Sequence, residues 1–296
     1  MRIDSHHHVW DLSVREQGWM VGEALNPIKK NFSINDLRQA ITGCGIDKTV
    51  VVQTVTNYDE TPELLELADT DDLVAGVVGF LKIDAEDAIS HLDSYQPLRG
   101  FKYLVGIRDI AHDYEDVKYL SKPQVIKNVQ ELGKRGLVYD LLTKTPHMRA
   151  AIDLVKACPN TKFVLDHISK PYIAKGDMQP WADQITELAS FENVVVKVSG
   201  LFTEADWKNW KKEDFWPYLE HITKSFTPNR MMFGSDWPVC LLAATYKQSI
   251  DLVEEFTSNF SESTLKRSQL RASIMAAKSK RSINASLRLP SFFMNL

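Results

Sequence analysis

Short apolar runs and helical patterns alternate along residues 2–257, and this alternation constrains the fold more than any other feature. Runs such as Val50, Val51 and Val52 are β-branched and bounded by turn formers, as expected of strands buried on both faces. Eight strands are predicted, each followed by a helix: 2–10, 48–54, 75–81, 99–105, 136–141, 161–167, 193–199 and 230–236. Eight successive units favour a closed (β/α)8 TIM barrel of the α/β class. An open doubly wound sheet would more often show a Gly-rich phosphate loop, and none is present.

Two histidines occupy alternate positions of the first predicted strand. Successive side chains of a strand point to opposite faces, so we expect His6 and His8 to point the same way and His7 the other. Asp236 ends the last predicted strand, which Pro238 interrupts. The first and last strands of a closed barrel are neighbours, so the two histidines and Asp236 are predicted to form one site.

Other polar side chains end the remaining predicted strands. Reactive groups of such barrels gather at the C-terminal ends of the strands. At or near these ends the sequence places Gln53, Lys102, Asp140, His167 and Lys197. We therefore expect them near the same mouth of the barrel.

Composition narrows the class of partner. The formal net charge of -4 provides no overall basic field for nucleic acid or an anionic membrane, which leaves small-molecule chemistry. Three scattered cysteines argue against a disulfide framework and fit a reducing compartment. The strand pattern begins at residue 2, leaving no room for a signal peptide, and no apolar run approaches the roughly 18 residues of a membrane span. A cytoplasmic location is expected, and the oligomeric state is left open.

The sequence changes character near its end. Residues 258–296 are basic, with no acidic side chain after Glu262, whereas residues 1–257 carry the barrel pattern. We expect a barrel domain over 1–257 and an atypical basic C-terminal segment over 258–296, read as a solvated terminus without an assigned function.

An ordered set of motifs resembles the amidohydrolase-related sugar lactonases, a family that includes L-fuconolactonase-like and L-rhamnonolactonase-like enzymes and is similar to pyrone-dicarboxylate lactonase. The motifs that carry the resemblance lie at 3–10, 52–54 with 59–61, 76–79, 99–102, 164–167 with 170–171, 196–200 and 233–238. The resemblance implies a (β/α)8 barrel that hydrolyses the ester of a sugar-acid lactone. The C-terminal segment departs from the family pattern.

Lactone hydrolysis requires a base for water, a group that stabilises the oxyanion and a proton source for the leaving alkoxide. Asp236 is the predicted base, although an Asp in this position also commonly caps a turn. His6 and His8 are predicted to polarise the lactone carbonyl or to hold a metal, and His167 to act as a donor or proton shuttle.

A divalent metal is expected at His6, His8 and Asp236. Two imidazoles and a carboxylate with open positions suit zinc or manganese. Metal-dependent relatives tend to bring a further histidine from the fifth strand, where this chain has Tyr139 and Asp140. Both an essential metal and a bound but non-essential metal therefore stay open.

The remaining polar and aromatic candidates are assigned to substrate binding. Lys102 and Lys197 recognise lactone oxygens, or else form a buried ion pair such as one with Asp140. Those assigned to the sugar pocket are Gln53, Asp140, Trp10 and Trp237, and each tryptophan equally fits simple packing. Because a fold alone does not fix a reaction, two alternatives remain: a metal-dependent decarboxylase or amide hydrolase, and a non-catalytic sugar-acid-binding barrel.

Overall fold

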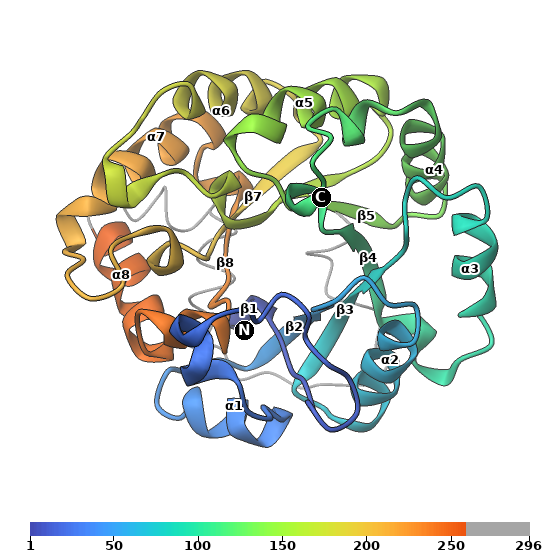
Figure 1. The fold of residues 1–296 in the computed structure, drawn as a ribbon, viewed down its shortest axis with the longest axis horizontal. Helices are drawn as coiled ribbons and strands as arrows, with labels where there is room; N and C mark the ends of the chain where they lie inside the picture. Colours follow the sequence, from blue (N-terminus) through green and yellow to red (C-terminus); the bar gives the residue numbers. More distant parts are fainter. Residues whose placement is uncertain (259–296) are drawn as a thin grey trace.

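A computed structural model describes residues 1–258, and these form one parallel barrel (Figure 1). Its strands are β1 (Ile3–His7), β2 (Lys48–Val52), β3 (Val74–Phe80), β4 (Leu104–Asp109), β5 (Val138–Leu141), β6 (Phe163–Leu165), β7 (Val194–Val198) and β8 (Met231–Phe233). Each strand pairs in parallel with the next along the chain. The predicted (β/α)8 architecture is confirmed. The predicted C-terminal segment lies outside the described residues, apart from Ser258.

The barrel closes along a seam between β1 and β8. A parallel bridge joins His7 to Trp237, and the main-chain amide of Asp236 donates to the His6 carbonyl oxygen at 2.9 Å. Beneath it the buried carboxylate of Asp4 accepts hydrogen bonds from the amide and the hydroxyl of Ser235, at 2.9 and 2.6 Å. The strands that begin and end the barrel are therefore fixed side by side.

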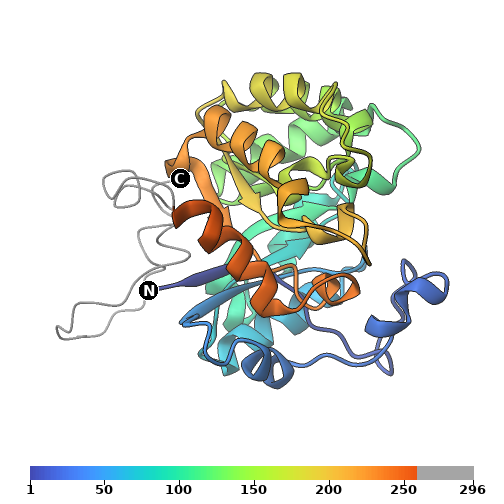
Figure 2. The ribbon, with the colours of Figure 1, turned by 90° about the vertical axis from the view of Figure 1, so that its left-hand side faces the viewer.

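Eight helices surround the strands (Figures 1 and 2). They are α1 (Ile34–Ala40), α2 (Glu60–Thr70), α3 (Ala88–Ser94), α4 (Pro123–Lys134), α5 (Met148–Ala157), α6 (Trp181–Ala189), α7 (Trp216–Phe226) and α8 (Tyr246–Ser258). Ser33 and Asp36 cap α1 reciprocally, because the polar residue before a helix satisfies its free amide groups. Figure 2 shows α8 beside the start of β1, where Arg2 pairs with Glu254.

Two apolar clusters fill the inside of the barrel. One consists of Ile3, Val50, Val52, Val78 and Val105. The other consists of Val138, Val164, Val195 and Met232. Side chains of the opposite pleat, including Val51 and Ile107, belong to the larger cluster between strands and helices. Strands buried on both faces are continuous apolar runs for this reason.

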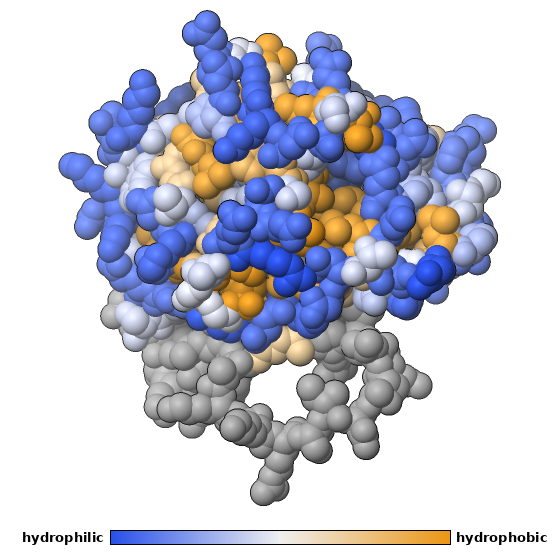
Figure 3. All heavy atoms as spheres, turned by 90° about the horizontal axis from the view of Figure 1, so that it is seen from below, coloured by the Kyte–Doolittle hydropathy of each residue, from blue (hydrophilic) through white to orange (hydrophobic). Residues whose placement is uncertain are grey.

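Large hydrophobic side chains are rarely exposed among the described residues, with Val14 and Val21 the most exposed. Figure 3 views the side that carries α1 and α2, where hydrophilic residues cover most of the surface and hydrophobic patches show between them. Within residues 1–258, no helix combines the length and apolarity needed to cross a membrane.

The predicted fourth strand, 99–105, differs from the observed strand β4, which spans Leu104–Asp109. Residues Arg99–Tyr103 form a 3-10 helix, and β4 begins only at Leu104. Lys102 therefore precedes the strand, at the N-terminal end of the barrel, where its side chain is 63% exposed and pairs with Asp69 at 2.9 Å. The prediction that Lys102 lies at the barrel mouth and binds substrate is wrong for this reason.

Candidate active site

The first strand presents His6 and His8 to the same side, as predicted. Their Nε2 atoms are 3.2 Å apart. His7 points away, with its Nε2 atom 2.9 Å from the Thr49 hydroxyl. Gly234 permits the close approach of β8, because a Cβ atom there would lie 2.6 Å from the Cβ atom of His6.

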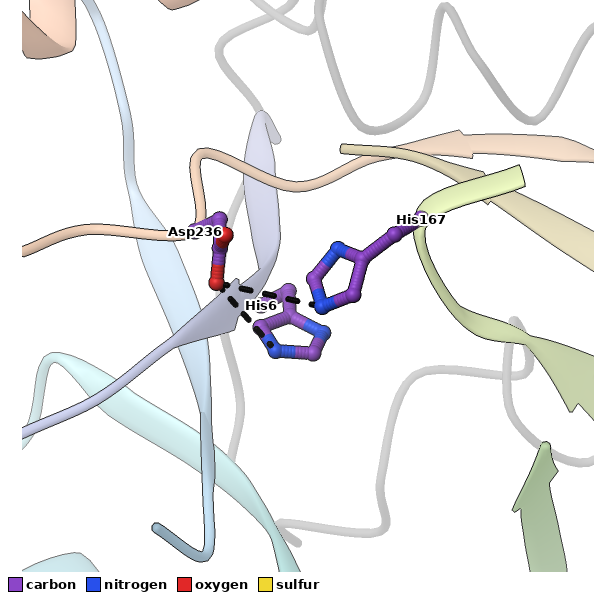
Figure 4. Close-up of side chains that lie close together, drawn as sticks. All are labelled: His6, His167 and Asp236. Atoms are coloured by element: carbon purple, nitrogen blue, oxygen red, sulfur yellow. Dashed lines mark ion pairs between the residues drawn. The ribbon is translucent and has the colours of Figure 1, made fainter. Parts of the chain in front are cut away.

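Asp236 follows β8 and faces three imidazoles. Its Oδ1 atom is 3.5 Å from His8 Nε2, 3.8 Å from His6 Nε2 and 3.9 Å from His167 Nε2. Figure 4 shows the rings of His6 and His167 converging on this carboxylate. We call His6, His8, His167 and Asp236 the open cluster. The residues predicted to be catalytic therefore lie together.

His167 begins a left-handed turn after β6. Residues 167–170 all have positive φ, between 47° and 60°, which costs roughly 1–2 kcal/mol per residue for side chains with a Cβ atom. Several contacts hold the turn: His167 Nδ1 lies 2.9 Å from the Ser199 hydroxyl, and Trp181 donates to the Ile168 carbonyl oxygen. Strained backbone of this kind persists where the surroundings over-determine it, as at functional sites.

Burial sets the charges of the open cluster. It holds the pKa values of His6 and His167 well below the ordinary imidazole value, so both rings are neutral near pH 7. Burial acts to raise the pKa of Asp236, but the neighbouring His167 and His8 outweigh it, and the net pKa lies below the usual carboxyl value. An ionised carboxylate therefore faces neutral rings.

A second set of buried polar residues lies beneath the open cluster. Lys197 forms ion pairs with Asp140 and, at 3.0 Å, with Asp166, while Arg108 donates to Asp166 at 2.9 Å. We call Asp140, Asp166, Lys197 and Arg108 the closed network, because each charge has an opposite charge as its partner. Burial raises the pKa of Asp140 to about 6. The contacts of Lys197 and Asp140 thus match the predicted alternative of a buried ion pair.

Arg108 and Asp166 are the residues that sequence reasoning missed. Arg108 lies near the end of β4, where the misplaced strand hid it. Asp166 adjoins the predicted His167 and faces His6 Nδ1 at 3.5 Å. Their position at strand ends was the available signal.

A pocket of about 360 Å³ opens above the open cluster. His8, His167 and Asp236 line its floor together with Arg108. Apolar walls come from Trp19, Ile110, Leu142 and Val239, and two cations, Lys144 and Lys170, contribute to its rim. The volume suits a small molecule of monosaccharide size.

The other predicted pocket residues lie elsewhere. Trp10 and Trp237 are both buried and pack edge-on against Phe32, with ring centroids 5.5 and 5.2 Å away, so packing accounts for them. Gln53 is buried beside β4, where its amide donates to the Arg108 carbonyl oxygen. None of the three is among the residues that line the pocket.

The open cluster has the donor set of a metal site. A tetrahedral zinc with bonds of about 2.0–2.1 Å needs ligand atoms about 3.3 Å apart, close to the 3.2, 3.5 and 3.8 Å among His6, His8 and Asp236. His167 offers an alternative third donor, since one atom each from His6, His167 and Asp236 lie within 4.8 Å of one another. His8 Nδ1 lies 2.7 Å from the Val52 carbonyl oxygen, which leaves Nε2 as the free donor.

Comparison with known proteins shows the family of this chain. A family model described as amidohydrolase matches residues 3–271. The chain belongs to the amidohydrolase family. This amidohydrolase is 32% identical to L-fucono-1,5-lactonase from Burkholderia ambifaria, over 83% of this chain and 83% of the relative. It is also 32% identical to L-fucono-1,5-lactonase from Burkholderia multivorans, over 88% of this chain and 89% of the relative.

A solved amidohydrolase from Burkholderia multivorans with bound zinc has the same fold. The TM-score is 0.85 at 31% identity, over 93% of this amidohydrolase and 98% of that chain. The predicted family and barrel are therefore confirmed.

Proposed function

We propose that this amidohydrolase hydrolyses a sugar-acid lactone, with L-fucono-1,5-lactone, named for its relatives, as the first substrate to test. The observation that carries the proposal is an ionised, buried carboxylate, Asp236, at the floor of a pocket of about 360 Å³ beside three imidazoles. Such a group abstracts a proton from water without a covalent intermediate.

Asp236 acts first as the general base. It takes a proton from a water molecule in the pocket while the water oxygen attacks the lactone carbonyl carbon. The carbonyl oxygen becomes an oxyanion, which His167 stabilises from the floor of the pocket. The ring C–O bond then breaks, and the proton held on Asp236 passes to the leaving alkoxide. The product is an open-chain hydroxy acid.

A divalent metal fits the same donors. His6, His8 and Asp236, with His167 as the alternative third ligand, would hold it. When bound, it would supply Lewis-acid polarisation of the lactone carbonyl. The proton transfers described above need only Asp236, so we propose that the metal is not essential.

The walls of the pocket match the chemistry of a deoxy-sugar lactone. Ile110, Leu142 and Val239 offer apolar contact to a methyl group. Lys144 places positive charge at the rim, where hydroxyl groups bind and the product carboxylate forms, and Lys170 there is paired with Glu204. A sugar that is polar on one edge and apolar on the other suits both sides.

A panel of aldonic and deoxy-aldonic lactones tests the proposal, with acid release followed by a pH indicator. We expect hydrolysis of L-fucono-1,5-lactone above the spontaneous rate, and slower hydrolysis of lactones that carry a hydroxyl in place of the methyl group. A rate no higher than the spontaneous one across the panel contradicts the proposal. Thermal stabilisation by the sugar acid without turnover would instead identify a binding protein.

A further inference from the structure

Arg108 is fixed against the atom of His6 that faces Asp236. Its Nη1 group lies 3.3 Å from His6 Nε2 and donates to Asp166 Oδ2 at 2.9 Å. Its Nη2 group donates to the main-chain oxygen of Gln53. The side chain is only 4% exposed. Acceptors at the ends of three different strands therefore hold the guanidinium in one place.

The chemistry of the contact assigns the proton on His6. A guanidinium only donates hydrogen bonds and does not lose its proton in proteins, so His6 Nε2 must be the acceptor. A neutral imidazole has one lone pair at this atom, and the Arg108 hydrogen bond uses it. The ring proton then lies on Nδ1, which faces Asp166 Oδ1 at 3.5 Å.

A metal ion needs the same lone pair. Histidine binds metals through an unprotonated nitrogen, so His6 Nε2 serves either Arg108 or a metal ion at a given time. We infer that Arg108 is an internal competitor of divalent cations for His6, and hence a positioning residue that keeps the site ordered without metal. The inference rests on the proposed ligand set, in which His6 binds the cation, and does not depend on lactone hydrolysis.

Metal binding must displace Arg108 against two penalties. The guanidinium would lie beside a divalent cation with its charge intact, because it cannot deprotonate. Moving away would break the buried hydrogen bonds to Asp166 and to the Gln53 carbonyl oxygen. Both penalties lower the affinity of the site for metal.

The test measures zinc affinity in metal-free protein. Arg108→Gln frees the His6 lone pair, and we expect zinc to bind on the order of 10- to 100-fold more tightly by calorimetry, with a stronger visible spectrum on cobalt titration. Lys144→Gln is the matched control, because it removes one positive charge from the same pocket without touching His6. Unchanged or weaker binding in Arg108→Gln, or an equal gain in both variants, overturns the inference.

The wild-type protein provides a second measurement that does not require the variant to fold. In ¹⁵N-labelled metal-free protein, we expect His6 to carry its proton on Nδ1. In a zinc-bound crystal structure, we expect Arg108 Nη1 beyond hydrogen-bond distance of His6 Nε2. Zinc on His6 with this hydrogen bond intact overturns the inference. Neither measurement uses a lactone, so a panel without turnover refutes only the proposed reaction.

Discussion

The closed network and the open cluster are neighbours in the same barrel, but they differ in how their carboxylates are paired. In the closed network, Asp166 has both Lys197 and Arg108 within 3.0 Å. In the open cluster, Asp236 has three imidazole rings between 3.5 and 3.9 Å away and no lysine or arginine at ion-pair distance within the described chain. Three of the four residues of the open cluster line the pocket, whereas Arg108 alone does so from the closed network.

This difference in pairing distinguishes a structural role for the closed network from the catalytic role proposed for the open cluster. A buried charge is tolerated when its partners are in place, and such a pair has no free capacity for a substrate. A carboxylate that faces only imidazole rings stays ionised and keeps its oxygens available for water, a proton or a metal ion. We therefore assign the closed network to holding the rings and the open cluster to the proposed reaction.

The largest effect is expected at the reactive side. Asp236→Asn removes the proposed base and should lower kcat/KM for the lactone by about 10²- to 10⁴-fold while the protein stays folded. Asp113→Asn is the control, since Asp113 lines the same pocket but pairs with His112. Steady-state kinetics and circular dichroism check this. Equal losses in the two variants would contradict the role proposed for Asp236.

A variant of the closed network should change the free energy of unfolding more than a variant of an exposed ion pair does. Lys197→Met leaves Asp140 with no cation at ion-pair distance and Asp166 with Arg108 alone, so we expect a loss of about 3–5 kcal/mol in the free energy of unfolding, measured with urea. Lys102→Met breaks an exposed ion pair with Asp69 and should leave the free energy of unfolding nearly unchanged. Similar values for both lysines would show that the closed network is not a support.

Gly200 lies close to the open cluster, because a Cβ atom there would lie 2.5 Å from Nδ1 of His167. Gly200→Ala should cost about 1 kcal/mol for its positive φ and also lower activity by displacing the ring. Gly176→Ala is matched, with a positive φ but no atom within 4 Å of the added carbon. Comparing Tm and kcat separates strain from displacement. Full activity in Gly200→Ala would contradict the role given to His167.

The smallest effect concerns pH. Burial raises the pKa of Asp140 from 3.8 to about 6, so the folded protein binds this proton more tightly than the unfolded chain. The stability that it contributes is fully present below about pH 4 and is lost as the pH rises through 6. Relative to Asp140→Asn, wild-type unfolding free energy should fall by on the order of 1 kcal/mol over this range. Parallel pH profiles in urea titrations would argue against it.

The sequence sufficed for the fold and for the open cluster because both follow simple periodicities. Alternate positions on a strand placed His6 and His8 together, and ring closure brought Asp236 to them. The closed network was only half found. Lys197 and Asp140 were named, but their choice between substrate and each other depends on distances that no local pattern contains.

Strand boundaries were the weak point. The segment from Arg99 to Val105 carries enough apolar residues to look like a strand, yet tertiary packing turns its first part into a 3-10 helix. A shift of this size moves the strand end from the predicted Val105 to Asp109, beside Arg108. Similarly, Trp10 and Trp237 are near the site in sequence, but their rings pack with Phe32.

The seam between β1 and β8 also has a consequence for biosynthesis. His6 and His8 lie at the end of the first strand of the barrel to be translated, whereas Asp236 follows the last strand. A nascent chain, or one cleaved before β8, therefore holds rings without their acid. The proposed catalytic group is complete only when the last strand docks against the first, so we expect no activity from a barrel that lacks β8.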